Sequence, residues 1–361
     1  MTRLPMPAFA GLLAAVLLAG CVPAAPTPAP TDTASPGSES TATPGDDDEA
    51  AAPGSRPDAR TEATCDDLVP PGSFDTLFAA PIALVDETRT GGRIGTVISD
   101  EWVIREAGGV VCEWQDAESL VTSEGYFSYQ GVRLLLLPAT DAQSDPYFAE
   151  AGGGRRFSEC TANYYCHLEA RTDRGWWMSL TALYFPTENP GTAALDALEQ
   201  VLFRVADLPA PSRVDAPRSG DAVDAACDRQ ITPAQAAAAL GAASATVETT
   251  AYPSIWKAAE QIVGGSECRW YGGELRDAYV TVLPGGEWAM DRAVAAYGPA
   301  EPVPLPGTSS GGYLRPQVEA QGFDFAIDGD WVQIVVTQSS ALPPREVMVA
   351  FAQAIIANAT D

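Results

Sequence analysis

The amino-acid sequence predicts an α+β protein with two tandem copies of one domain, each a mostly antiparallel sheet with helices packed on one face and each with a disulfide. The first observation is a repeated motif, G-G-x-x-C-x-W, at Gly108–Trp114 and at Gly264–Trp270. The second is an even number of cysteines after Cys21. The third is that strand-like and helix-like runs follow in the same order around both motifs.

The repeat extends well beyond this motif. Each copy opens with a cysteine, has a tryptophan before the double glycine, an apolar strand ending in proline after it, a later tryptophan, and a closing helical pattern. Because these features recur in one order, we interpret them as a duplicated unit. The pairs are Cys65 and Cys227, Trp102 and Trp256, Leu134–Pro138 and Val280–Pro284, Trp176 and Trp331, and Leu195–Val205 and Val347–Ile356.

Each copy is expected to begin with a short helix after its first cysteine. In the second copy, Thr232–Gln235 combines a cap residue, a proline at the first helical position and a glutamine at N3, and Gly241 marks the end. A second helix is predicted over 99–107 and over 254–263. The double glycine ends both, because glycine adopts the left-handed conformation that terminates helices.

The predicted strands follow these helices. The x-x-C-x-W segment enters one strand, and Val132–Leu137 and Ala278–Leu283 form the next. The first of these two is almost wholly apolar, which favours a central position in its sheet. A hairpin then turns through Thr172–Gly175 in the first copy and through Asp328-Gly329 in the second, a strong hairpin signal between alternating runs.

The N-terminus predicts export and lipid attachment. Arg3 gives a positive start, and Phe9–Ala19 is an apolar run of signal-peptide length rather than of membrane-span length. Leu18–Cys21 resembles the bacterial lipoprotein cleavage site, which implies removal of residues 1–20 and acylation of Cys21, for example with palmitate. The alternatives are an ordinary secretory cleavage or an uncleaved helix. Acylation would anchor the protein on the outer face of the cytoplasmic membrane.

The remaining chain divides by composition. Residues 21–63 are rich in Pro, Thr, Ala, Ser and Asp and predict a disordered tether. Its run Asp46–Glu49 could suggest a calcium site, but four consecutive acids in a flexible segment have no defined geometry. We place the first domain at 64–207, a linker at 208–222 and the second domain at 223–361.

The six cysteines after Cys21 suggest disulfides, because an even count in an exported chain is typical of them. Zinc is the competing interpretation, and it is weak because the chain has no C-x-x-C pair and a single histidine. The repeat predicts equivalent pairs in the two copies and a local pair that the second copy lacks. The expected disulfides are Cys65–Cys112, Cys227–Cys268 and Cys160–Cys166.

The charge of the chain limits its partners. Lys+Arg is 21 and Asp+Glu is 48, for a net charge of −27. Nucleic acid is therefore not an expected partner, because a phosphate backbone needs a basic face. An anionic wall polymer would also be repelled.

The repeated pattern resembles a group of uncharacterised secreted lipoproteins of high-GC Gram-positive bacteria, whose domains share an early cysteine, a G-G-x-x-C-x-W-like strand and a proline-containing apolar strand. It is more distantly similar to the extracellular sensor domains of bacterial Ser/Thr kinases. The first resemblance covers most of Cys65–Asp361 and implies solute or polymer binding outside the cell. It supplies no catalytic residues, and this chain has no kinase.

We predict no catalytic residues, no cofactor and no metal. Ser254 and Lys257 have the S-x-x-K spacing of penicillin-binding enzymes, but S-D-N and K-T-G are absent and Ser254 fits a helix N-cap. His167 would have to serve any Ser-His-Asp or Cys-His site, and we interpret it as a polar surface residue beside Cys166. Acids at 324, 328 and 330 lack the spacing of a calcium loop.

Aromatic residues that differ between the copies are the candidates for ligand contact, with copy-specific packing as the alternative. They are Tyr164, Tyr165, Trp177, Tyr184 and Trp288. The function expected is a non-catalytic binding or sensing module for a wall polymer, a peptide or an envelope protein. The alternatives are a lipid or small-molecule carrier with an internal apolar pocket, and a cell-wall hydrolase with two acids in a cleft.

Overall fold

The computed structural model describes residues 56–75, 77–78, 81–85, 100–116, 131–150, 156–161, 165–183, 191–212, 222–249, 253–273, 277–296, 300–315, 320–337 and 343–359. The description below concerns the unit Ala50–Asp361. The predicted signal peptide, Cys21 and residues 21–55 of the predicted tether lie outside the described residues. None of the helices in the described ranges is long and apolar enough to cross a membrane.

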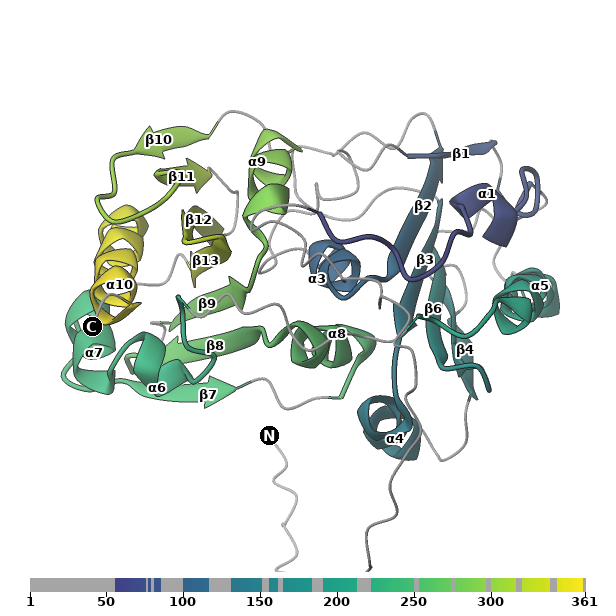
Figure 1. The fold of residues 1–361 in the computed structure, drawn as a ribbon, viewed down its shortest axis with the longest axis horizontal. Coiled ribbons are helices and arrows are strands. Elements are labelled where there is room, and N and C mark those ends of the chain that lie inside the picture. Colours follow the sequence, from purple (N-terminus) through teal and green to yellow (C-terminus); the bar gives the residue numbers. More distant parts are fainter. Residues whose placement is uncertain are drawn as a thin grey trace, which may run out of the picture. The chain divides into compact units, whose positions relative to one another are not determined.

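The first repeat forms a six-stranded antiparallel sheet in the order β1-β2-β3-β6-β5-β4 (Figure 1). The apolar strand β3 lies inside the sheet, as its composition predicts. The strands are β1 (Ile82–Leu84), β2 (Val110–Asp116), β3 (Gly131–Pro138), β4 (Arg156–Thr161), β5 (Tyr165–Arg171) and β6 (Trp176–Leu183).

The second repeat forms a seven-stranded antiparallel sheet in the order β10-β11-β12-β13-β9-β8-β7. Six of its strands follow the order of the first sheet, and β10 is an addition at the edge. The strands are β7 (Thr246–Thr249), β8 (Ser266–Tyr271), β9 (Asp277–Leu283), β10 (Glu301–Val303), β11 (Gly312–Arg315), β12 (Ala320–Ile327) and β13 (Asp330–Thr337). The predicted fold class, a duplicated α+β unit, is confirmed.

Helices cover both faces of each sheet, so the structure adds a second helical layer to the single one expected. On the outer face of the first sheet lie α1 (Cys65–Leu68) and α5 (Gly191–Asp207), and on the inner face lie α3 (Asp100–Glu106) and α4 (Asp141–Glu150). In the second repeat the outer helices are α6 (Cys227–Gln230), α7 (Pro233–Leu240) and α10 (Pro344–Ala359), and the inner ones are α8 (Ile255–Val263) and α9 (Glu287–Ala296).

The helix signals act as the sequence predicts. Thr232 and Gln235 form a capping box, and Gly241 ends α7 with a φ of 63°. Ser254 caps α8, and Gly264 ends it with a φ of 72°. In the second hairpin both Asp328 and Gly329 have positive φ, the conformation of a type I′ turn.

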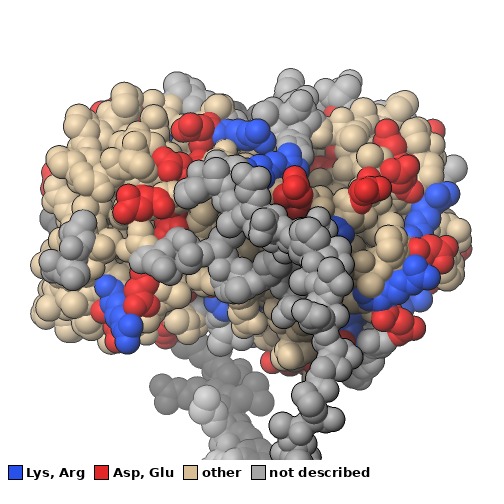
Figure 2. Space-filling model, in the orientation of Figure 1, with Lys and Arg blue, Asp and Glu red and all other residues tan. Residues whose placement is uncertain are grey.

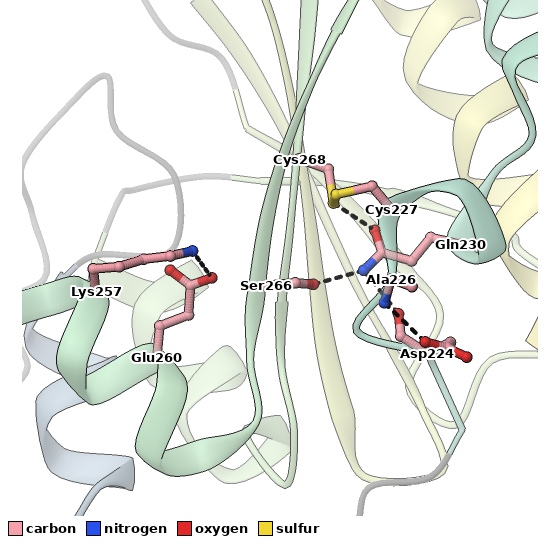
Figure 3. Close-up of a disulfide and its surroundings, with 8 residues drawn as sticks. All are labelled: Asp224, Ala226, Cys227, Gln230, Lys257, Glu260, Ser266 and Cys268. Atoms are coloured by element: carbon pink, nitrogen blue, oxygen red, sulfur yellow. Dashed lines mark hydrogen bonds and ion pairs between the residues drawn. A yellow bond between two sulfur atoms is a disulfide. The ribbon is translucent and has the colours of Figure 1, made fainter. Parts of the chain in front are cut away.

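All three predicted disulfides form. Cys65 joins Cys112 and Cys227 joins Cys268, each tying the first helix of a repeat to the strand after the double glycine. Cys160 and Cys166 are directly opposite each other on β4 and β5. In the second repeat, Gln230 fixes the surroundings of the disulfide, because its Nε2 donates to Ser266 Oγ (2.6 Å) while its Oε1 lies 3.3 Å from Cys268 Sγ (Figure 3).

Strand register defines which residues of the two repeats are equivalent. Cys112 pairs with Leu134 and Cys268 with Val280, so Leu137 and Leu283 occupy the same place. Their partners on the next strand are Trp177 and Trp331. The sequence comparison that matched Trp176 with Trp331 was therefore wrong by one position, because adjacent tryptophans cannot be distinguished without the register.

The two repeats share a core on their inner faces. Each sheet has an outer core of its own, and a third cluster joins α3 to α8, which are equivalent helices packed against each other. From the first repeat it contains Trp102 and Trp177, and from the second Ile255 and Trp331, all buried. The two sheets are therefore held together by apolar packing as well as by the linker.

Candidate functional site

A line of polar side chains crosses the inner face of the first sheet. Glu159, His167, Thr181, Arg133 and Glu113 are consecutive cross-strand partners on β4, β5, β6, β3 and β2. Since cross-strand partners share a face, these five side chains form one row, which we call the polar row. Three further polar side chains, Glu169, Arg171 and Ser179, are buried on the same face, beside the apolar residues of the shared core.

His167 is the centre of the polar row. Its Nδ1 lies 2.8 Å from Thr181 Oγ1 and its Nε2 lies 3.1 Å from Glu169 Oε1. Alternation along β5 places it on the face opposite Cys166, which is buried in the outer core. The imidazole is half-buried rather than exposed. His167 is next to the disulfide in sequence, but its side chain lies on the other face of the sheet.

Glu169 lies beside the row and binds two further donors. Trp177 Nε1 donates to its Oε2 at 2.9 Å, and the Tyr147 hydroxyl of α4 donates to the same carboxylate. Burial, together with the charges of Glu169 and Glu159, raises the pKa of the Tyr147 phenol, so this hydroxyl keeps its proton. The carboxylate is therefore held in one orientation against the imidazole.

Arg133 occupies the other side of Thr181. Its Nη1 donates to Glu101 Oε1 of α3 at 2.7 Å, and its guanidinium lies 5.5 Å from the centre of the Trp256 ring. Trp256 belongs to α8 of the second repeat, so both repeats contribute to this end of the site. Within the described residues, the other guanidinium nitrogens of Arg133 make no hydrogen bond, and the side chain is 11% exposed.

The second repeat does not preserve this chemistry. Strand register places Arg315, Gly322, Val335, Tyr279 and Arg269 at the positions of the polar row. By contrast, the pair of a carboxylate and an indole is preserved, since Asp324 accepts from Trp331 Nε1 at 3.0 Å as Glu169 does from Trp177. The fold therefore needs the acid–indole pair in both repeats, whereas the polar row belongs to the first.

Of the aromatic residues predicted to contact a ligand, those that the structure describes are not gathered on one surface. Trp177 is 0% exposed in the shared core, so its place in a ligand-contacting surface was wrong; it matches Trp331 in position and packing. Trp288 packs edge-on against Trp102 at 5.5 Å, and its indole donates to Glu106 at 2.6 Å. Tyr165 is half-buried at the start of β5 and donates to Glu159. Tyr164 and Tyr184 lie outside the described residues.

The S-x-x-K residues have structural partners. Ser254 Oγ accepts from the backbone N–H of Lys257, and Lys257 Nζ donates to Glu260 Oε1 at 2.6 Å. Burial raises the pKa of the Glu260 carboxyl, against the opposing effect of this hydrogen bond. Figure 3 shows this pair on the other side of the strands from the Cys227–Cys268 disulfide.

Two of the acidic residues considered above for a calcium loop also form ion pairs or hydrogen bonds within the protein. Asp324 pairs with Arg315, and Asp330 accepts from the backbone N–H groups of Val223 and Gly285. Among the described residues, no three His, Cys, Asp or Glu side chains are placed to hold a metal ion.

An open groove of about 580 Å³ lies between 59–63 and 208–212. Chain segments at the edge of the first repeat line it, rather than residues from either sheet. It therefore differs from the dry pocket behind a sheet that the carrier alternative requires.

Comparison of the chain with protein-family models, with curated proteins and with solved structures gives no match.

Proposed function

We propose that the chain is a cell-envelope lipoprotein whose first repeat binds a polar ligand outside the membrane, at the polar row. The observation that carries this proposal is the difference between two equivalent sheets. They share a strand order, a disulfide and an acid–indole pair, yet they differ at all five positions of the row. Residues that the shared fold does not require are the best candidates for a specific role.

The proposed location has two supports. The sequence around Leu18–Cys21 resembles a lipoprotein cleavage site, and the three disulfides join all six of the later cysteines. Disulfides persist outside the cytoplasm, where thiols are not kept reduced. Acylation of Cys21 would hold the repeats near the outer face of the cytoplasmic membrane.

The proposed ligand is a polar, non-anionic part of the cell wall, such as the peptide or glycan of peptidoglycan. The net charge of −27 disfavours strongly anionic polymers. On the face drawn in Figure 2, basic side chains lie beside acidic ones. The row itself offers carboxylates, an imidazole, a hydroxyl and a guanidinium, which suit hydroxyl and amide groups of such a ligand.

The test is sedimentation of the purified protein with insoluble peptidoglycan from which anionic polymers have been removed. Arg133→Met and His167→Gln should each weaken binding about tenfold or more, because truncation of a central contact removes over 1 kcal/mol. Arg345→Met is the matched control, since this exposed arginine of the second repeat pairs with exposed Glu301.

Binding that is lost in both row variants and retained in the control supports the proposal. A wild-type protein that stays in solution, or row variants that bind as well as Arg345→Met, would refute it.

A further inference from the structure

We infer that Thr181, His167 and Glu169 form a hydroxyl–imidazole–carboxylate relay that can transfer an acyl group from an ester to Thr181. This goes beyond ligand binding. The geometric requirement for such a relay is a hydroxyl within hydrogen-bond distance of a base, and a base oriented by a third group. Both contacts are present, at 2.8 Å from Thr181 to His167 and 3.1 Å from His167 to Glu169.

The carboxylate decides which imidazole nitrogen carries the proton. Ionised Glu169 can only accept, so Nε2 of a neutral His167 donates to it. Nδ1 then has a lone pair, and the hydrogen bond to Thr181 must have the hydroxyl as its donor. This arrangement points the hydroxyl proton at the base, as in a Ser-His-Asp site, with the two imidazole nitrogens exchanged.

Trp177 and Tyr147 hold the carboxylate in place from other directions, through an indole N–H and a phenol O–H. Both partners are neutral donors, so they orient Glu169 without cancelling its charge. Glu169 is accordingly a positioning residue, acting through the imidazole.

Arg133 supplies a positive group for the developing oxyanion. It is the cross-strand partner of Thr181 on β3, on the side of the hydroxyl away from His167. Only its Nη1 is engaged among the described side chains, by Glu101, so the remaining N–H groups can bind a carbonyl oxygen. The substrate class is therefore a carboxylic ester whose carbonyl lies between Thr181 and Arg133.

The reaction proceeds in two balanced steps. Thr181 Oγ1 attacks the carbonyl carbon while its proton passes to Nδ1 of His167. The carbon–oxygen bond to the alcohol then breaks, and the leaving oxygen takes that proton, which gives a free alcohol and an acyl ester on Thr181. Water loses a proton to the same nitrogen and attacks this ester, which releases the carboxylic acid and restores the hydroxyl.

The test uses the full chain with p-nitrophenyl acetate, followed by release of p-nitrophenol and by peptide mass spectrometry. The wild type should carry an acetyl group on Thr181, and Thr181→Ser should retain it. Thr181→Val has nearly the same shape and should abolish both the adduct and the release. His167→Gln should lower the acylation rate roughly 100-fold or more, the usual contribution of a general base. Glu169→Gln should lower kcat with KM unchanged, which a purely structural role would not do selectively.

Acetyl groups found only on His167, or release unchanged in Thr181→Val, would overturn the relay. Thermal melts of each variant establish that the fold is kept, and Thr181→Ala is the second variant without the hydroxyl if valine unfolds the chain. Acylation by this ester does not require wall binding, so the relay and the proposed ligand site can fail separately.

Discussion

Asp324 offers the sharpest test of the packing described above. Its side chain is 0% exposed, and it accepts hydrogen bonds from Arg315, from Trp331 at 3.0 Å and from Gln333 at 2.8 Å. Arg315 is 1% exposed, so the two charges neutralise each other in the interior. Replacement of Asp324 by asparagine would keep the shape and some acceptors but remove the carboxylate charge that pairs with the buried guanidinium of Arg315.

The expected loss is about 3–5 kcal/mol of unfolding free energy, the usual result of removing one partner of a buried ion pair. The corresponding fall in Tm is on the order of 10 °C. Glu169→Gln at the equivalent position of the first repeat is the matched variant. Among the described residues, its donors are an imidazole, an indole and a phenol rather than a guanidinium, so the expected loss there is about 1–3 kcal/mol.

The assay is urea unfolding followed by tryptophan fluorescence, with the thermal midpoint as a second measure. A double variant, Arg315→Met with Asp324→Asn, removes both charges while keeping an oxygen acceptor for Trp331 and Gln333. It should recover most of the lost stability, because a buried pair can be replaced by uncharged side chains at little cost. Equal losses for Asp324→Asn and Glu169→Gln, or no recovery in the double variant, would show that buried charge is not the reason.

Three further predictions concern the disulfides, a buried acid and the anchor. Replacing both cysteines of Cys65–Cys112 should lower the free energy of unfolding by about 4 kcal/mol, and replacing both of Cys160–Cys166 by about 2 kcal/mol, because the closed loops span 47 and 6 positions. A larger loss for the shorter loop in urea unfolding would contradict this. Since burial raises the pKa of Glu260, the stability it contributes is present below its unfolded pKa and lost as pH rises through the folded value. Glu260→Gln should thus be more stable than the wild type at neutral pH and lose that advantage on acidification, and melts showing a constant difference would refute this. Cys21→Ser should abolish acylation and release the protein from membranes, as fractionation and mass spectrometry of the N-terminal peptide would show; retention in the membrane fraction would exclude an anchor at this residue.

Much of the fold could be predicted because local signals agreed with the duplication. The double glycine could be recognised as a helix end from the local sequence alone, since Gly108 and Gly264 both have positive φ there. The disulfide pairs followed from equivalence between the copies. The inner helix α4 was not predicted, because Pro146 lies inside it. Thr140 and Gln143 nevertheless repeat the box seen at Thr232 and could have indicated its start.

The polar row could not be predicted, because it depends on register across five strands. Alternation along Cys166–Arg171 places His167, Glu169 and Arg171 on one face, and this part can be predicted from the sequence. That Thr181 lies beside His167, and Arg133 beside Thr181, depends on strand pairings set by loops of unequal length. A shift of one residue would move every one of these side chains to the other face.

The packing of the two repeats against each other explains how the polar side chains of one repeat could come to differ from those of the other. The equivalent helices α3 and α8 pack on each other. The other inner helices reach across reciprocally: α9 of the second repeat contacts α3 through Trp288, and α4 of the first contacts α8. This is the pattern of a two-fold interface, in which a patch meets its own copy.

In a dimer of identical chains, any change at such an interface occurs twice. Within one chain it occurs once, so Arg133 can lie over Trp256 while the equivalent Tyr279 flanks Arg269 instead. The covalent duplication keeps the stabilising contacts symmetric and lets the polar side chains differ. This argues that specificity, whether for a ligand or for an ester, resides in the first repeat, with the second completing its core and supplying Trp256.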